Sequence, residues 1–250
     1  MATSNSTIRS LVAIGLAVGL LAAACGSSST SSPTGPAGGT SGPNATGGAS
    51  LTSGLSSNLA NLDSYKFTWS LSGSSSGTAA SPGDSGALAV SGTIINKPSP
   101  AAFVNDLGMQ FIVIGNQAWL SSDGNSWTTT DPTTFDVTDL LPSNDYATWF
   151  DANSTDFTVA GEETKNGIEC IRYTGNSSLG AMYAAAGVSA QFQADLWVAK
   201  DGNYPVSGVY GFAAAAGGQS GAFYYTFDIT NVNDASNTVT PPTNVISVPT

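Results

Sequence analysis

The side chains able to do chemistry in this chain are few, and the two thiols, Cys25 and Cys170, are the most reactive among them. The sequence has no histidine, the commonest general base and metal ligand. It has no Ser-x-x-Lys motif, no phosphate-binding glycine loop and no EF-hand spacing. Glu162 and Glu163 are adjacent, so on a strand they point to opposite faces and form no catalytic pair. We therefore expect no enzymatic activity, no cofactor and no bound metal.

Cys25 directly follows an apolar run of 14 residues, 11–24, which ends in three alanines and is preceded by one cation, Arg9. A membrane-spanning helix needs roughly 20 residues, so the run fits a cleaved leader better than a permanent anchor. It resembles the signal peptide and lipobox of bacterial lipoproteins, with Ala22 where lipobox patterns usually have leucine. The resemblance implies cleavage before Cys25 and lipidation of its thiol. The alternative is an ordinary secretory signal cleaved near Ala24, with Cys25 unmodified.

The chain divides into three parts by composition. Residues 1–24 are the expected signal peptide, and residues 25–50 are the cysteine and a segment of only Gly, Ser, Thr, Pro, Ala and Asn. Such a segment buries too little apolar surface to fold, and we expect a linker spanning roughly 25–30 Å. Residues 51–250 can form one domain, which we expect to end in an irregular tail around Pro241 and Pro242. The lipobox implies that Cys25 attaches this domain to the cell membrane on the extracytoplasmic side.

The charge of the chain excludes some partners. Five basic and 17 acidic residues follow Cys25, which gives this part a formal charge of −12. Nucleic acid is excluded because phosphate binding needs clustered Lys and Arg. Electrostatic binding to anionic lipid is excluded for the same reason, and the acidity is best explained as an aid to solubility. We expect a monomer.

Apolar and polar residues alternate through most of residues 51–250, as in strands with one buried face. Residues 65–71 show this best, with Tyr65, Phe67, Trp69 and Leu71 on one face. Further strands are expected at residues 88–94, 111–114, 118–121, 127 onward, 157–163, 168–174, 192–199, 206–213 and 222–232. Turns are expected at residues 115–117, 123–125, 165–167 and 201–203, which carry Gly, Asn or Asp.

Helical patterns are fewer. Residues 51–62 place Leu51, Leu55, Leu59 and Leu62 at helical spacing, and shorter helices are expected near residues 143–150 and 179–188. The sequence thus predicts an α+β fold that is mainly antiparallel β, with a few helices covering one face of the sheet. Cys170 lies in the expected strand 168–174 and is predicted to be a buried structural thiol.

The order of these motifs is similar to the LolA-like lipoproteins, in particular the LppX/LprG-type group. The similarity rests on the lipobox and linker, then LDSYKF at 62–67, IGNQAWL at 114–120 and LWVAKDGNYPV at 196–206. It implies a curved, half-open sheet whose concave face is covered by helices around an apolar cavity. It also implies that the protein binds acyl chains of lipids and carries them in the cell envelope.

Such a cavity needs apolar residues along its wall. The candidate lining residues are Phe67, Trp69, Leu71, Leu88, Val90, Ile112, Ile114, Met182, Phe192, Leu196, Val209 and Phe212. For each of them, ordinary core packing is the alternative.

A second function remains open on the residues alone, that of a non-catalytic envelope protein that binds or regulates other proteins. Its core would be fully packed and without a ligand. Tyr146, Trp149, Tyr224 and Tyr225 would then be candidates for a contact patch.

Overall fold

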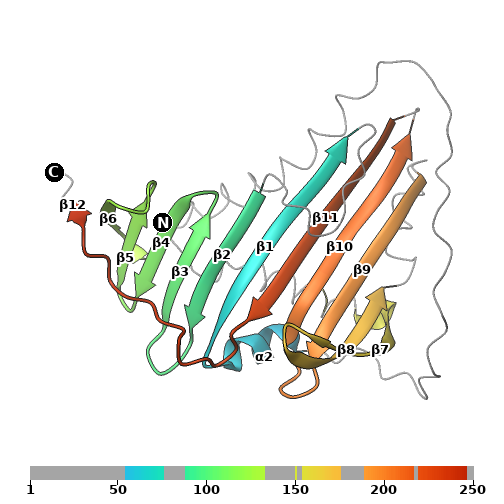
Figure 1. Cartoon of the computed structure of the whole chain (residues 1–250), viewed down its shortest axis with the longest axis horizontal. Helices are drawn as coiled ribbons and strands as arrows, with labels where there is room; N and C mark the ends of the chain where they lie inside the picture. The colour runs from blue at the N-terminus through green and yellow to red at the C-terminus, as the bar shows by residue number, and fades with distance from the viewer. Residues whose placement is uncertain are drawn as a thin grey trace, which may run out of the picture.

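One open sheet of 12 strands organises the protein. We describe residues 54–75, 88–132, 150, 154–175, 189–216 and 219–246 of a computed structural model. The strand order is β12-β6-β5-β4-β3-β2-β1-β11-β10-β9-β8-β7, so the two edge strands do not pair with each other (Figure 1). The long strands β1, β11, β10 and β9 form the centre and one half of this sheet.

The elements have the following bounds. The helices are α2 (Leu55–Asn61) and a 3-10 turn, η3 (Ser154–Asp156). The first strands are β1 (Ser64–Ser75), β2 (Leu88–Ile95), β3 (Ala101–Asp106), β4 (Met109–Ile114), β5 (Gln117–Ser121) and β6 (Trp127–Thr130). The later strands are β7 (Phe157–Lys165), β8 (Ile168–Gly175), β9 (Ser189–Ala199), β10 (Pro205–Ala216), β11 (Gln219–Thr230) and β12 (Val245–Ile246).

The predicted antiparallel sheet is confirmed. Every neighbouring pair of strands is antiparallel except β12 with β6, which is parallel. β3 and β12 were not predicted, because β3 follows a proline-containing segment and β12 is only two residues long. The predicted helix at 179–188 lies outside the described residues, as does the helix at 143–150 except for Phe150, which is helical and fully buried.

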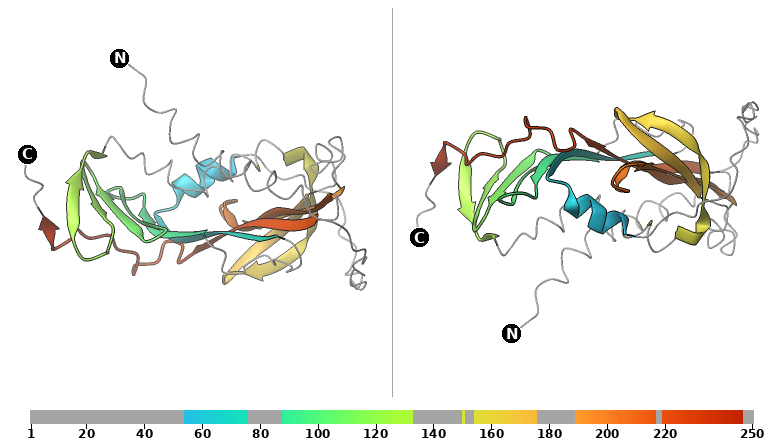
Figure 2. Two further views of the ribbon diagram at one scale, coloured as in Figure 1. Left: turned by 90° about the horizontal axis from the view of Figure 1, so that it is seen from above. Right: turned by 90° about the horizontal axis from the view of Figure 1, so that it is seen from below.

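Helix α2 covers part of one face of the sheet. Leu55 and Leu59, one turn apart, point to the same side of the helix and are fully buried. They pack in one cluster with Phe67, Phe227 and Leu196 of the sheet. Figure 2 shows α2 on one side of the sheet and the segment after β11 on the other. We call the first side the helix face and the second the tail face.

The main core lies on the helix face, where two large rings lie over glycines. Phe67 of β1 is directly opposite Gly92 of β2, and Phe227 of β11 is opposite Gly208 of β10. A Cβ atom at either glycine would overlap the neighbouring phenylalanine ring. Glycine at these positions therefore lets both rings approach the backbone of the sheet closely.

The tail face carries a second, smaller core. Ile112, Trp119 and Trp127 of β4, β5 and β6 are buried together, and Val239 packs on them from residues 231–246. Those residues run along the tail face from the end of β11 to β12 (Figure 1). The predicted irregular tail is therefore a segment packed on the sheet, with a two-residue strand near its end.

Side-chain hydrogen bonds hold the start of this tail to the start of β1. Asn233 accepts hydrogen bonds from the backbone N–H groups of Asp63 and Ser64 at 2.7 and 3.2 Å. Asn237 is 8 % exposed and donates through its Nδ2 to Ser64 Oγ at 2.9 Å and to the Asn231 carbonyl at 2.6 Å. The three bonds to Asp63 and Ser64 join residues about 170 positions apart in the chain.

Replacing Asn237 should destabilise the domain. The substitution Asn237→Ala leaves the buried Ser64 hydroxyl and the Asn231 carbonyl without this donor, and we expect a loss of about 1–3 kcal/mol in the free energy of unfolding. Urea denaturation measures the loss. Thr238→Ala, one residue along on an exposed position, is the matched control and should unfold like the unmodified protein. Equal stability of both variants would contradict a tail fixed by these bonds.

Candidate functional site

A row of aromatic rings crosses four neighbouring strands on the helix face. Trp69 of β1 lies 5.5 Å from Tyr225 of β11, measured between ring centroids. Tyr225 lies 6.3 Å from Tyr210 of β10, and Tyr210 lies 5.0 Å from Phe192 of β9 in an edge-to-face contact. All four rings are only partly buried. The row is therefore apolar surface held in place by the sheet and not fully enclosed in the core.

The helix face around this row carries no formal charge on the strands that form it. The registers place no charged residue on the helix face of β1, β2, β11, β10 and β9, where apolar residues, glycines and tyrosines predominate. Burial raises the pKa of the Tyr225 hydroxyl, which keeps it neutral across the physiological range. This surface can contact apolar groups and offers little to a charged ligand.

The structure brings most of the predicted lining residues to this face. By register, one face carries Phe67, Trp69, Leu71, Leu88, Val90, Phe192 and Leu196. Phe67 and Leu196 are fully buried beneath α2. Leu88, at the end of β2 farther from α2, is 37 % exposed. The register also places Phe212 on this face, although its side chain lies outside the described residues, as does Met182.

Three predicted lining residues lie on the tail face. Ile112 and Ile114 alternate with Phe111 and Val113 in β4, and they join the small core beneath the tail. Val209 of β10 pairs with Thr226 and Asp195, whose side chains also lie on the tail face. These three residues cannot line a site on the helix face.

The cause of each misplacement is visible in the sequence. Residues 111–114 are all apolar, so alternation cannot tell which of them faces α2. In β10, Val209 and Phe212 are three residues apart and no bulge lies between them, so alternation places them on opposite faces and only one of the two can line the helix face.

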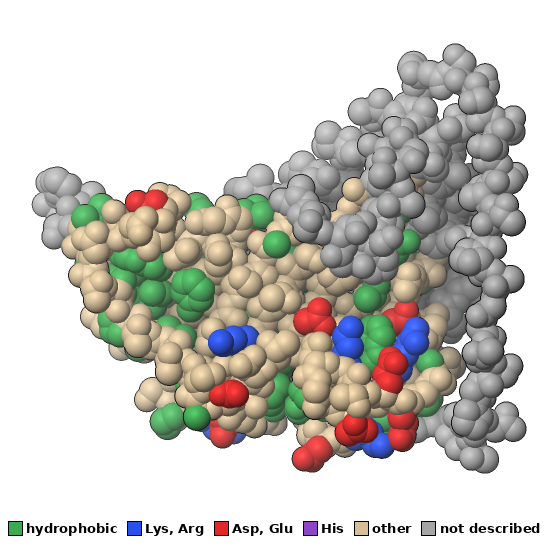
Figure 3. All heavy atoms as spheres, viewed as in Figure 1, with side chains coloured by type: hydrophobic (Ala, Val, Ile, Leu, Met, Phe, Trp, Pro, Cys, Tyr) green, Lys and Arg blue, Asp and Glu red, His purple; other side chains and the backbone are tan. Residues whose placement is uncertain are grey.

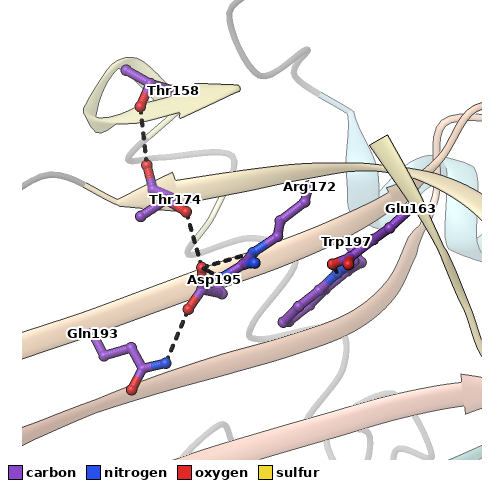
Figure 4. A network of polar contacts seen from close by, with 7 residues as sticks. All are labelled: Thr158, Glu163, Arg172, Thr174, Gln193, Asp195 and Trp197. Atoms are coloured by element: carbon purple, nitrogen blue, oxygen red, sulfur yellow. Dashed lines mark hydrogen bonds and ion pairs between the residues drawn. The ribbon is translucent and has the colours of Figure 1, made fainter. Parts of the chain in front are cut away.

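The tail face has a polar constellation that the sequence analysis did not single out. Asp195 of β9 is 4 % exposed, and its Oδ1 accepts bonds from Arg172 Nε and Nη2 at 3.2 and 3.0 Å (Figure 4). Thr174 donates to the same oxygen at 2.9 Å, and Gln193 donates to Oδ2 at 3.0 Å. Four donors thus satisfy one buried carboxylate, which is a structural role.

Trp197 lies beside this network and meets several charged groups. Lys165 Nζ lies 4.8 Å and Arg172 Cζ 5.3 Å from the ring centroid, and the indole N–H donates to Glu163. Figure 3 shows charged side chains gathered on this half of the tail face and an apolar patch on the other half. The signal in the sequence was the placement of Arg172, Asp195 and Trp197 at alternate positions of adjacent strands, whose pairing only the fold supplies.

Two further sequence predictions concern reactive groups. Cys170 is fully buried, as predicted, and burial raises the pKa of its thiol. Its Sγ lies 3.2 Å from the Ile168 carbonyl. The carboxylates of Glu162 and Glu163 go to different partners, Lys200 and Trp197, so they do not act as a pair.

The described part of the chain holds neither a cluster of metal ligands nor a membrane-spanning helix. None of its His, Cys, Asp and Glu side chains gather in threes as a metal site would require. None of its helices is both long and apolar enough to cross a membrane.

The comparisons with known proteins give a weak likeness among the solved structures. No protein-family model matches the chain, and no curated protein matches it. Among solved structures, the chain resembles the crystal structure of MucB in complex with MucA(peri), with 11% identity and a TM-score of 0.27. The alignment covers 70% of this chain and 56% of that one, so it spans little more than half the length of the solved chain.

The Asp195 network should matter for stability. Asp195→Ala removes the acceptor of four side-chain bonds and leaves Arg172 without its partner, so we expect a loss of about 2–4 kcal/mol in the free energy of unfolding. Glu162→Ala is the control, because it breaks an exposed ion pair with Lys200 and should leave the urea midpoint unchanged. A midpoint for Asp195→Ala equal to that of the control would rule out a structural network.

Proposed function

We propose that this protein is a LolA-like envelope lipoprotein that binds lipid acyl chains on the helix face. The observation that carries the proposal is the row formed by Trp69, Tyr225, Tyr210 and Phe192, partly buried on an uncharged face. An acyl chain is long, flexible and without polar groups, so it gains free energy from any continuous apolar surface that removes it from water. A row across four strands offers such a surface.

The shape of the fold fits this use of the helix face. The sheet is open, and within the described residues α2 and Phe150 cover only its centre. Phe150 packs against Phe157 at 5.1 Å and against Phe227 at 6.4 Å between centroids, and the aromatic row extends beyond these contacts. In a LolA-like fold, this is the space between sheet and helices in which an acyl chain lies.

The proposal extends to location and partners. Lipidated Cys25 attaches the protein to the cell membrane, and the linker at 25–50 holds the domain on the extracytoplasmic side. The protein acts as a monomer, without catalysis, and does not bind nucleic acid. The competing function is a protein-binding envelope module, whose candidate patch contained Tyr224 and Tyr225. By register these two tyrosines point to opposite faces of β11, so they do not share one patch, and Tyr146 and Trp149 lie outside the described residues.

The adjacent tyrosines of β11 provide a matched test of acyl-chain binding. Tyr225 lies in the row and Tyr224 on the tail face, and both are partly buried. With residues 26–250 and a fluorescent fatty acid, Tyr225→Ser should weaken binding by about tenfold, because it removes an apolar ring contact worth about 1–2 kcal/mol. Tyr224→Ser should bind like the unmodified chain.

Native mass spectrometry of the same chain, purified without detergent, supplies the independent readout. We expect a population carrying a lipid that is released on denaturation. A clean apoprotein mass together with no fatty-acid binding would refute the proposal and favour the protein-binding module. Equal loss of binding in both tyrosine variants would place the ligand elsewhere.

Lipidation at Cys25 is tested with the two cysteines of the chain. When the full chain is produced in bacteria fed an alkyne-bearing fatty acid, it should become labelled. Cys25→Ser should abolish the label, whereas Cys170→Ser should keep it, because Cys170 is buried in the domain. Loss of label only in Cys170→Ser, or no label at all, would exclude a lipoprotein anchored at Cys25.

A further inference from the structure

Three exposed apolar side chains lie at the same end of the neighbouring strands β2, β3 and β4. Among the described residues, five large apolar side chains are exposed, and three of them are Leu88 (37 %), Leu107 (58 %) and Met109 (45 %). Leu88 begins β2, and Leu107 lies in the turn that joins β3 to β4, which begins at Met109. β3 ends and β4 begins beside the start of β2, so the three residues lie at the same end of these strands (Figure 1). We call them the apolar tip.

The turn that holds Leu107 is strained for a leucine. Asp106 pairs with Met109, so the loop is two residues long, and Leu107 and Gly108 have φ values of 52° and 90°. Positive φ at both positions is typical of a type I′ turn, which favours Asn-Gly. The β7–β8 turn of this same protein has that sequence, Asn166-Gly167, with φ values of 54° and 81°.

A leucine in this conformation costs about 1 kcal/mol relative to residues that adopt it readily. Its side chain is the most exposed of the large apolar residues in the described chain, so packing does not offset the cost. Folding alone would therefore favour asparagine or glycine at position 107. An observed strain of this kind points to a function of the side chain itself.

The apolar tip is continuous with the aromatic row. Leu88 lies opposite Leu71, which lies opposite Tyr225, and all three are on the helix face. One level further along, Met109 pairs with Asp106, which pairs with Val90 opposite Trp69. Two adjacent levels of side chains thus connect the tip to the proposed acyl-chain site.

The chemistry of the tip selects its partner. Residues 104–110 and 88–90 contain no Lys or Arg, and their one ionisable side chain is Asp106. Apart from the carboxyl of Asp106, the residue that pairs with Met109, the tip is apolar and without cations. A clustered apolar surface of this kind fits the acyl region of a bilayer, with binding that depends on buried area and not on lipid charge. The 29 residues from 25 to 53 span at most about 95 Å when extended, so a domain attached at Cys25 can turn any corner toward the membrane.

We propose that Leu107, Met109 and Leu88 insert into the membrane surface and form the place where an acyl chain passes between the bilayer and the aromatic row. This inference rests on the proposed acyl-chain site and names its partner, the lipid bilayer. Contact with the bilayer would also shield the exposed side chains, which supplies the reason for a leucine in an unfavourable turn.

Co-flotation with neutral phosphatidylcholine vesicles tests the inference. Residues 26–250 keep every described residue and lack both the apolar leader and Cys25, so any binding comes from the domain. We expect binding that changes little between low and high salt, because no cation takes part. Leu107→Asn should reduce binding, and Leu107→Asn with Met109→Ser should reduce it at least tenfold. Leu107→Asn should also unfold at equal or higher urea concentration, which excludes misfolding as the cause.

The control replaces the other exposed apolar pair. Val245 and Ile246 of β12 are 43 % and 50 % exposed, and their double serine variant should float like the unmodified chain. Absence of vesicle binding by the unmodified chain, or equal binding by the tip variant, would overturn the inference. So would equal loss in both double variants.

A second assay separates this inference from the proposed function. A fluorescent fatty acid is added either as monomer in solution or within the vesicles. The tip variant should take up the monomer normally but receive it from vesicles at least tenfold more slowly. If the unmodified chain takes up the monomer normally but does not bind vesicles, the role of the tip is refuted and the acyl-chain site is not. No uptake from either source refutes the site itself.

Discussion

The structure depends on burying the apolar face of its long central strands. β1, β11, β10 and β9 turn a nearly continuous set of apolar side chains to the helix face, and such a surface is costly in water. Leu55, Leu59 and Phe150 cover its middle, where Phe67 and Phe227 reach full burial. Toward one end of the strands the cover thins, and the aromatic row remains partly buried. The proposed site is therefore the part of the core that the described residues do not complete.

The tail face is organised differently, because its polar side chains need hydrogen-bond partners and do not need to be covered by apolar groups. Ser70 and Thr226 bond to each other at 2.6 Å across β1 and β11, and Asp195 collects four donors across β8 and β9. Where β4 to β6 are apolar on this side, the tail supplies Val239 as a cover. On the tail face, polar groups are thus paired and the apolar residues are covered. On the helix face, the aromatic row is left partly exposed.

Within this arrangement Leu107 is the residue that folding does not explain. The equivalent position of the β7–β8 turn holds Asn166, whose amide bonds to Asp228 and to the Ile229 carbonyl and so contributes to the fold. Leu107 makes no comparable polar contribution and leaves its side chain in water. The proposed contact of the apolar tip with the bilayer gives this exposed side chain a role in acyl-chain exchange.

The local sequence determined most of the strands, turns and helix positions of this protein. Alternation located most of the strands, and the Gly, Asn and Asp turns located their connections, because strand period and turn conformation are properties of a few adjacent residues. The spacing of Leu55 and Leu59 likewise located α2. The predicted signal peptide and lipidation at Cys25 depend only on the residues just before that cysteine.

Tertiary structure decided which side chains meet. Ile112 and Ile114 lie on the tail face although a fully apolar strand has no preferred parity, and the pairing of β10 places Phe212 and not Val209, three residues away, on the helix face. The pairing of Arg172 with Asp195 required the register of β8 against β9, and the aromatic row required four strands, two of them more than 120 residues from β1 in the chain. The residue types that line a site can thus be read from short segments of the sequence. Their assembly into a site depends on long-range strand pairing, which no short segment specifies.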